Sequence, residues 1–329
     1  MEIFNNEFVT LYNCDSRQIP IPDGSVDCVV TSPLYYGLRD YGINGQIGLE
    51  ESPEEYANTM VEVFREVWRV LKPTGTVWLN LGDSYSSQGG AEPEQTVRKS
   101  SNYVNRGQLG KDGVGTSRKA VPGLKPKDLV GIPWKVAFAL QADGWYLRSD
   151  IIWSKPNPMP ESVHDRPTKA HEYIFLLTKS PKYYYDADAI REITGKEASW
   201  DNYGGKGMID HPTGPGRKQI DLTMGTSQKK AMPYISHPNG RNKRSVWTIN
   251  TQPYSEAHFA TFPEKLIEPC ILAGCPEAGV VLDPFVGSGT TAAVAQKHGR
   301  KSVGVDLNKE YLDIAIKRIT STQPRLLLS

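Results

Sequence analysis

The sequence is poor in cysteine and has neither a long apolar run nor a marked net charge. Its four cysteines among 329 residues lack the density of a disulfide framework and the spacing of zinc ligands, so we expect reduced thiols and no metal site. The apolar runs are far shorter than the roughly 20 residues that a membrane span needs, and the polar, acidic start does not resemble a signal peptide. We therefore expect a cytoplasmic protein with no membrane partner. The net charge of +1 does not by itself indicate a polyanionic partner.

Strand-like and helix-like segments alternate along much of the chain. This alternation predicts an α/β fold in which a doubly wound, mostly parallel sheet is covered by helices on both faces. The expected strands are 10–13, 26–31, 76–81, 145–153, 173–178, 280–283 and 302–306. The expected helices are 53–71, 133–142, 263–273, 290–298 and 309–320, the first ended by the turn at 73–75.

Two irregular stretches, 84–127 and 187–250, interrupt this pattern and hold much of the positive charge. Residues 96–127 contain eight basic residues and one acidic residue, and residues 187–250 contain ten basic and six acidic residues. Such basic insertions favour contact with phosphates, although charge runs are often only solvated loops. The candidate DNA-binding residues are Arg98, Lys99, Arg118, Lys119, Arg217, Lys218, Arg241, Lys243 and Arg244.

A glycine-rich segment near the C-terminus follows a predicted strand and begins a predicted helix. It contains Asp283, Phe285 and the run Gly287-Ser288-Gly289-Thr290, and the next strand ends at Asp306. Glycines permit a tight turn against a ligand, and an acid at the end of the second strand can accept hydrogen bonds from ribose hydroxyls. A P-loop is excluded because no Gly-Lys-Ser/Thr follows. The carboxylate of Asp283 suits a sulfonium and an ammonium group, which favours S-adenosylmethionine over a dinucleotide.

A second segment near the N-terminus carries polar and aromatic side chains directly after a predicted strand. The Ser32 hydroxyl and the Pro33 carbonyl are suited to accept hydrogens from an exocyclic amino group, and Tyr35 could stack on a base. An exocyclic amine is a poor nucleophile, so acceptors and alignment would help the reaction. Such a pocket requires a base that is flipped out of the duplex. The alternative interpretation is an ordinary turn after a strand.

Together, these two segments resemble a known family. Thr31-Ser32-Pro33-Leu34-Tyr35 resembles the Ser-Pro-Pro-Tyr motif of amino-methylating DNA methyltransferases, and residues 283–291 resemble their Asp-Pro-Phe-x-Gly-Ser-Gly-Thr-Thr cofactor motif. The catalytic motif comes first, as in the β group, whose fold is circularly permuted. The resemblance implies that S-adenosylmethionine is the cofactor and double-stranded DNA the partner. It further implies that Asp15 contacts the cofactor adenine and that Phe262 and Pro263 close over the cofactor.

The resemblance also predicts the organisation of the chain. Residues 1–186 would form the catalytic part of the methyltransferase domain, with a basic loop at 84–127. Residues 187–250 would form a target-recognition region, and residues 251–329 the cofactor-binding part. The protein would associate with the nucleoid, and whether a cognate restriction endonuclease accompanies it stays open.

Two residues of the first motif bear on activity. Ser32 favours cytosine N4 as the methylated atom, with adenine N6 as the alternative. Leu34 replaces the second proline of the motif, and because proline stiffens the chain, this change raises the alternative of a DNA-binding homologue with impaired catalysis. A methyltransferase for RNA or for a small molecule is a further alternative. The basic insertions argue against the small molecule, because it offers few phosphates to contact.

Overall fold

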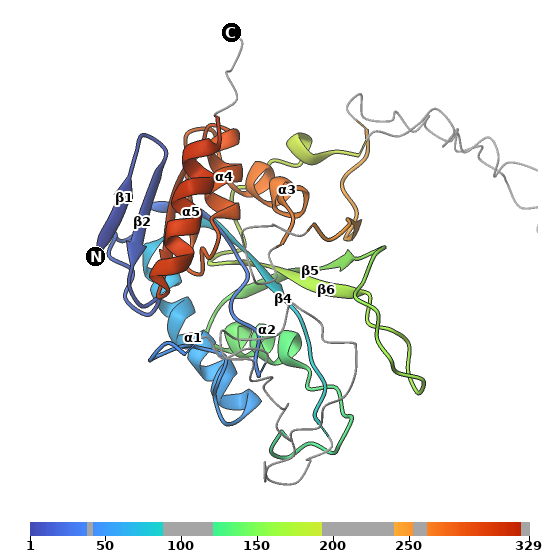
Figure 1. The fold of residues 1–329 in the computed structure, drawn as a ribbon. Coiled ribbons are helices and arrows are strands. Elements are labelled where there is room, and N and C mark those ends of the chain that lie inside the picture. The colour runs from blue at the N-terminus through green and yellow to red at the C-terminus, as the bar shows by residue number, and fades with distance from the viewer. Residues whose placement is uncertain (38–41, 88–120, 193–239, 253–261, 324–329) are drawn as a thin grey trace, which may run out of the picture.

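The computed structural model describes residues 1–37, 42–87, 121–192, 240–252 and 262–323. Its described strands form one sheet in the order β1-β2-β9-β8-β3-β4-β6-β5-β7 (Figure 1). The strands are β1 (Glu2–Asn5), β2 (Val9–Asn13), β3 (Val26–Thr31), β4 (Leu71–Leu81), β5 (Tyr146–Ser154), β6 (His171–Thr178), β7 (Val246–Thr248), β8 (Val280–Asp283) and β9 (Lys301–Asp306). The helices are α1 (Pro53–Val70), α2 (Ile132–Ala142), η1 (Asp188–Ile190), α3 (Glu264–Gly274), α4 (Thr290–Lys297) and α5 (Lys309–Ser321).

The centre of the sheet brings together strands from opposite ends of the chain. β3 pairs with β8 in parallel, with Cys28 opposite Val281 and Val29 opposite Leu282. β8 in turn pairs with β9, and β9 with β2, also in parallel. Because the carboxyl ends of parallel strands lie at one edge, the segments that follow β3, β8 and β9 meet there.

Helices cover both faces of the sheet (Figure 1). Alternate residues of β3 point to opposite faces: Val29 packs with the side chains of α1 and α2, whereas Cys28 and Val30 pack with those of α3. α1 begins with Pro53 after Ser52, whose hydroxyl caps the helix by accepting from the Glu55 N–H at 3.2 Å. The doubly wound α/β fold is confirmed.

The structure differs from the predicted elements in several places. β1 and β7 were not predicted; they have four and three residues, and neither contains a continuous buried apolar run like that of β8. The turn at 73–75 was expected to separate helix from strand, but β4 already begins at Leu71. There Leu71 pairs with Val26, and the register shifts between Val26 and Cys28, as in a β-bulge. In the described part of the chain, no helix is long and apolar enough to cross a membrane.

Candidate active site

The two sequence motifs meet at a buried carboxylate. Thr31 Oγ1 donates a hydrogen bond to Asp283 Oδ1 at 2.7 Å, and Thr291 Oγ1 donates one to Asp283 Oδ2 at 2.6 Å. The Phe285 N–H also donates to Asp283 Oδ1, at 3.0 Å. Asp283 is only 2% exposed, and burial raises its pKa to about 6. The carboxylate is therefore engaged inside the protein, and its contact with a cofactor stays a prediction.

The glycine-rich loop is fixed to the end of β9. The Gly287 N–H donates to Asp306 Oδ2 at 2.9 Å, and the Asn308 N–H donates to Asp306 Oδ1 at 2.8 Å. Burial raises the pKa of Asp306 to about 6. Gly289 has a φ of +77°, and a Cβ there would lie 2.9 Å from the Cβ of Ala315. Both the conformation and the packing therefore require glycine at position 289.

Ser288 is the residue of this loop that best matches a ligand site. Its Oγ is buried and has no hydrogen-bond partner among the described residues, although buried hydroxyls usually have one. A nucleoside-type ligand with polar groups would satisfy this oxygen. The residues of the loop thus fit the predicted cofactor.

The other predicted cofactor residues occupy separate positions around the loop. Asp15 follows β2, next to β9 in the sheet, and forms an ion pair with Arg17 at 2.6 Å. The hydrogen bonds from Arg17 lower the pKa of Asp15. Phe262 packs against the core on the α3 face, and Pro263 precedes α3. Thr290 Oγ1 accepts a hydrogen bond from the guanidinium of Arg318 at 2.7 Å, so this side chain already has a protein partner.

The segment after β3 presents the predicted catalytic residues. Ser32 is partly exposed and Pro33 is buried, and among the described residues no hydrogen bond uses the Pro33 carbonyl. The next carbonyl, that of Leu34, accepts a hydrogen bond from Tyr56 Oη at 2.8 Å. The Gly37 N–H donates to the Gly48 carbonyl at 2.8 Å. The loop is therefore fixed on both sides of Tyr35 without a proline at position 34.

Tyr35 belongs to a buried polar cluster that the sequence analysis missed. Tyr35 Oη donates to Glu172 Oε2 at 2.7 Å, and Asn80 Nδ2 donates to the same oxygen at 3.3 Å. Lys155 forms an ion pair with the other oxygen of Glu172, and the two side chains are 16% and 15% exposed. A Cβ at Gly82 would lie 2.5 Å from the Tyr35 ring. No spacing rule could have found this cluster, because its members come from β4, β6 and the segments that follow β3 and β5.

The predicted DNA-binding residues divide into two groups. Arg98, Lys99, Arg118, Lys119, Arg217 and Lys218 lie outside the described residues. Arg241 and Arg244 both pair with Glu192, at 3.0 and 3.1 Å. Lys243 lies over the ring of Trp247, 5.0 Å from its centroid, and has no carboxylate partner within the described ranges.

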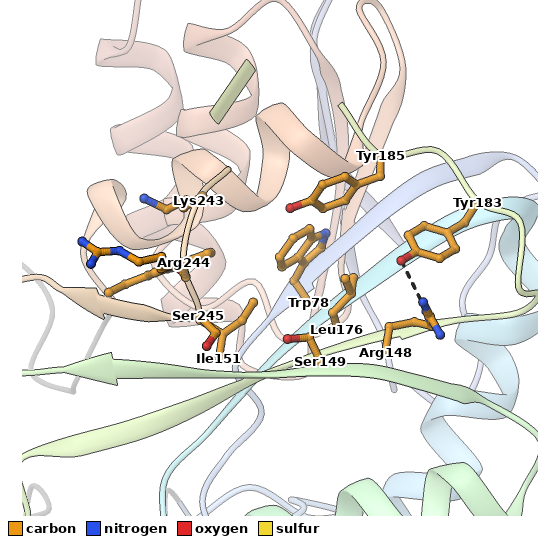
Figure 2. A pocket seen from close by; sticks show the side chains of 11 residues that line it. Trp78, Arg148, Ser149, Ile151, Leu176, Tyr183, Tyr185, Lys243, Arg244 and Ser245 are labelled. Atoms are coloured by element: carbon orange, nitrogen blue, oxygen red, sulfur yellow. Dashed lines mark hydrogen bonds between the residues drawn. The ribbon is translucent and has the colours of Figure 1, made fainter. Parts of the chain in front are cut away.

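Lys243 and Arg244 line a pocket of about 190 Å³ (Figure 2). Figure 2 shows these two cations on one side of the pocket and Tyr183 and Arg148 on the other, with Trp78, Leu176 and Tyr185 between them. Trp78, Arg148 and Leu176 belong to β4, β5 and β6. Arg148 donates a hydrogen bond to Tyr183 Oη at 3.3 Å. The pocket lies over one face of the sheet and contains none of the catalytic or cofactor residues predicted from the sequence.

The fold, the glycine-rich loop and the acceptor segment beside it define a methyltransferase-type α/β protein. A family model described as DNA methylase matches residues 26–317. The chain belongs to this family of N4/N6 DNA methyltransferases, as the resemblance predicted.

Relatives and solved structures agree with this assignment. The Type II methyltransferase M.Cfr9I of Citrobacter freundii is 45% identical over 318 residues, which cover 94% of this chain and 87% of the relative. The Type II methyltransferase M.SmaI of Serratia marcescens is 47% identical over 294 residues, which cover 89% and 84%.

Two solved structures share the fold. PvuII DNA methyltransferase (cytosine-N4-specific) has a TM-score of 0.60 at 18% identity and covers 95% of this chain and 86% of its own. A putative DNA modification methylase of Thermus thermophilus, complexed with S-adenosyl-L-methionine, has a TM-score of 0.54 at 22% identity and covers 96% and 95%.

Proposed function

We propose that this DNA methyltransferase transfers a methyl group from S-adenosylmethionine to N4 of a flipped-out cytosine. The observation that carries the proposal is the hydrogen bond between Thr31 and Asp283, which holds the acceptor segment beside the cofactor loop. S-adenosylmethionine is the methyl donor and supplies a methyl group activated by its sulfonium. The residues around it bind and orient the reactants.

In the proposed cofactor site, each residue has one task. The backbone and hydroxyl groups of residues 287–290 line the ligand, and Asp306 accepts hydrogen bonds from the ribose. Asp15 lies at the adenine, while Phe262 and Pro263 cover the cofactor. Asp283 and Phe285, which also fix the loop relative to β3, lie beside the cofactor in this proposal. Ser288 Oγ, which lacks a hydrogen-bond partner in the described part of the chain, supports this assignment, because a bound polar ligand would supply one.

In the proposed base site, Ser32 Oγ and the Pro33 carbonyl accept the hydrogens of the target amine, and Tyr35 packs against the base. Accepting these hydrogens increases the electron density on nitrogen and aligns its lone pair, and alignment of this kind can supply several kcal/mol, roughly 7–11 in the best intramolecular cases. The Pro33 carbonyl, which no described residue uses as an acceptor, and the partial exposure of Ser32 support this role. The proton lost from nitrogen passes to solvent or a neighbouring acceptor.

Cytosine is proposed because the first motif residue is Ser32, and a structural neighbour bears the description cytosine-N4-specific. The alternative is adenine N6, because a serine hydroxyl can accept hydrogens from either amine. A catalytically impaired homologue is less well supported, since the contacts of Leu34 and Gly37 hold the loop in the absence of the second proline.

For DNA binding, we propose that the cations of the two basic stretches contact phosphates and that residues 187–250 read the target sequence. Among the predicted DNA-binding residues that the structure describes, Lys243 has no carboxylate partner within the described ranges, whereas Arg241 and Arg244 pair with Glu192. A cognate restriction endonuclease that cuts the same sequence is a proposed partner. DNA treated with this enzyme should then resist that endonuclease.

The test is to incubate the pure protein with labelled S-adenosylmethionine and unmethylated genomic DNA, and then to analyse the nucleosides by mass spectrometry. N4-methylcytosine supports the proposal, whereas N6-methyladenine supports the alternative base. If no methylated base forms, even with Leu34→Pro, the DNA substrate is contradicted. Activity that appears only in Leu34→Pro would identify an impaired homologue.

A further inference from the structure

A buried ion pair lies beside the proposed base site, and the proposed function gives it no task. Glu172 is the second residue of β6 and pairs in register with Trp153 of β5, two residues before Lys155. Both charged side chains are largely removed from solvent. A buried ion pair is weak evidence for stability, because apolar residues of similar volume are often as good or better. A role in the site would explain its position.

The two carboxylate oxygens of Glu172 accept hydrogen bonds from different side chains. Oε1 accepts from Lys155, and Oε2 accepts from Tyr35 Oη at 2.7 Å and from Asn80 Nδ2 at 3.3 Å. Lys155 is itself held over the Trp153 ring, 4.2 Å from its centroid. The carboxylate is therefore fixed from several directions, and charge-assisted hydrogen bonds of this kind are the stronger ones.

This arrangement determines which way the Tyr35 hydroxyl points. A phenol has one hydrogen, and at 2.7 Å Glu172 is its nearer acceptor; Asn80 Oδ1 lies at 3.3 Å. Burial and the neighbouring Glu172 carboxylate raise the pKa of Tyr35 well above its usual value, so the phenol keeps this hydrogen for Glu172. Glu172 thereby fixes, at its hydroxyl end, the ring that the proposed function places against the target base.

We infer that Glu172, fixed by Lys155, is a positioning residue for methyl transfer, because it anchors the Tyr35 hydroxyl and thereby holds the ring that packs against the target base. This role rests on the proposed function and adds to it a cluster from β5 and β6 that acts through Tyr35. It predicts that Glu172 affects the rate of transfer and leaves cofactor affinity unchanged, since its contacts with the described residues do not include the cofactor loop.

The test is a double-mutant cycle with Tyr35→Phe and Glu172→Gln, measured by single-turnover methylation of DNA at saturating cofactor. We expect each single change to lower the rate constant by about 10- to 100-fold, the scale of a misplaced reacting group. The double variant should be within about twofold of the slower single variant, because both changes break one chain of contacts. The amplitude of the turnover and the dissociation constant of S-adenosylmethionine should stay as in the unsubstituted enzyme.

A matched control is Glu66→Gln on α1. Glu66 is also ion-paired, with Arg69 at 2.9 Å, and its side chain is 25% exposed, but it contacts no residue of the proposed site. This variant should keep the full rate constant. Lys155→Met provides a second variant if Glu172→Gln does not fold, and it should also lower the rate constant.

The possible outcomes are distinct. Multiplicative losses in the double variant would overturn the positioning role and leave the proposed function intact. A lower amplitude with an unchanged rate constant would show a purely structural role and would also overturn it. Absence of transfer by the unsubstituted enzyme would contradict the proposed function itself, and with it this role.

Discussion

Thr31 and Asp283 are hydrogen-bonded at 2.7 Å, although 252 positions separate them in the chain. Thr31 ends the strand before the proposed base site, and Asp283 ends the strand before the proposed cofactor site. This buried contact, together with the pairing of β3 with β8, therefore sets the distance between the two sites. A shift there would move one reactant relative to the other.

Thr31→Val should weaken both the fold and the reaction. Valine matches threonine in shape but leaves Asp283 without one buried donor, a loss that costs about 1–3 kcal/mol. We expect the free energy of unfolding in urea to fall by that amount, together with the rate constant for methyl transfer. Thr10→Val is the control, because the Thr10 hydroxyl makes only a 3.4 Å contact with Asn5. Equal effects at both positions would show that Thr31 has no special role.

Asp283→Asn should change how stability depends on pH. The pKa of Asp283 is raised from 3.8 to about 6, so the folded state binds this proton more tightly than the unfolded state does. Its stabilising contribution is complete below the unfolded pKa and is lost as the pH rises through about 6. Asp283 should therefore make the wild type more stable near about pH 5 than near about pH 7.5, by on the order of 1 kcal/mol. In urea unfolding, the Asn variant should lack this extra stability at the lower pH. An equal pH dependence of stability in both proteins would contradict the raised pKa of Asp283.

Asp306→Asn should remove a pH dependence of cofactor binding. Burial raises the pKa of Asp306 to about 6, and the protonated carboxyl loses acceptor capacity for the ribose hydroxyls. Titration calorimetry should show that the affinity for S-adenosylmethionine falls by up to about tenfold per pH unit below this pKa. The Asn variant should bind more weakly at neutral pH and show a flatter profile. Asp283→Asn keeps Asp306, so this variant should still lose affinity for S-adenosylmethionine as the pH falls below about 6.

Tyr56→Phe should loosen the catalytic segment at Leu34. The change removes the hydrogen bond to the Leu34 carbonyl but keeps the ring that packs against Tyr36, 5.8 Å between centroids. We expect a loss of about 0.5–1.5 kcal/mol in stability and a lower rate constant for transfer. Tyr12→Phe is the control, since Tyr12 makes only a long contact with Glu2. Adding Leu34→Pro to Tyr56→Phe should recover part of the rate, and no recovery would contradict the stiffening role.

Lys243→Ala should weaken DNA binding in a salt-dependent manner. If Lys243 contacts one phosphate, the plot of log affinity against log salt should become shallower by roughly one unit. Fluorescence anisotropy with duplex DNA measures this slope. Lys301→Ala provides the control, because Lys301 is an exposed cation at the start of β9, away from the pocket. An unchanged slope for Lys243→Ala would remove this residue from the DNA interface.

The sequence allowed the central strands and both motif segments to be placed, because buried parallel strands are short apolar runs that end at characteristic residues. β3 and β8 were predicted with the bounds that the structure has. Their adjacency was not predicted, because spacing alone does not reveal strand order, and it is the structure that shows it. The hydrogen bond between Tyr35 and Glu172 joins residues 137 positions apart, and no periodicity encodes such a contact. The same holds for the engagement of Asp283 by Thr31, which only the packed structure shows.

The order of the strands has a consequence for how this protein forms. β2 and β3 are close in the sequence, but β8 and β9 lie between them in the sheet. During synthesis the gap between β2 and β3 can close only when the final segments of the chain have emerged. Contacts of such long sequence separation slow folding, and until they form, the edges of β2 and β3 are open to wrong pairing. A ribosome that stalls before β8 should therefore hold an aggregation-prone nascent chain with no cofactor site. The insertion of β8 and β9 between β2 and β3 is then the step that commits the chain to its native state.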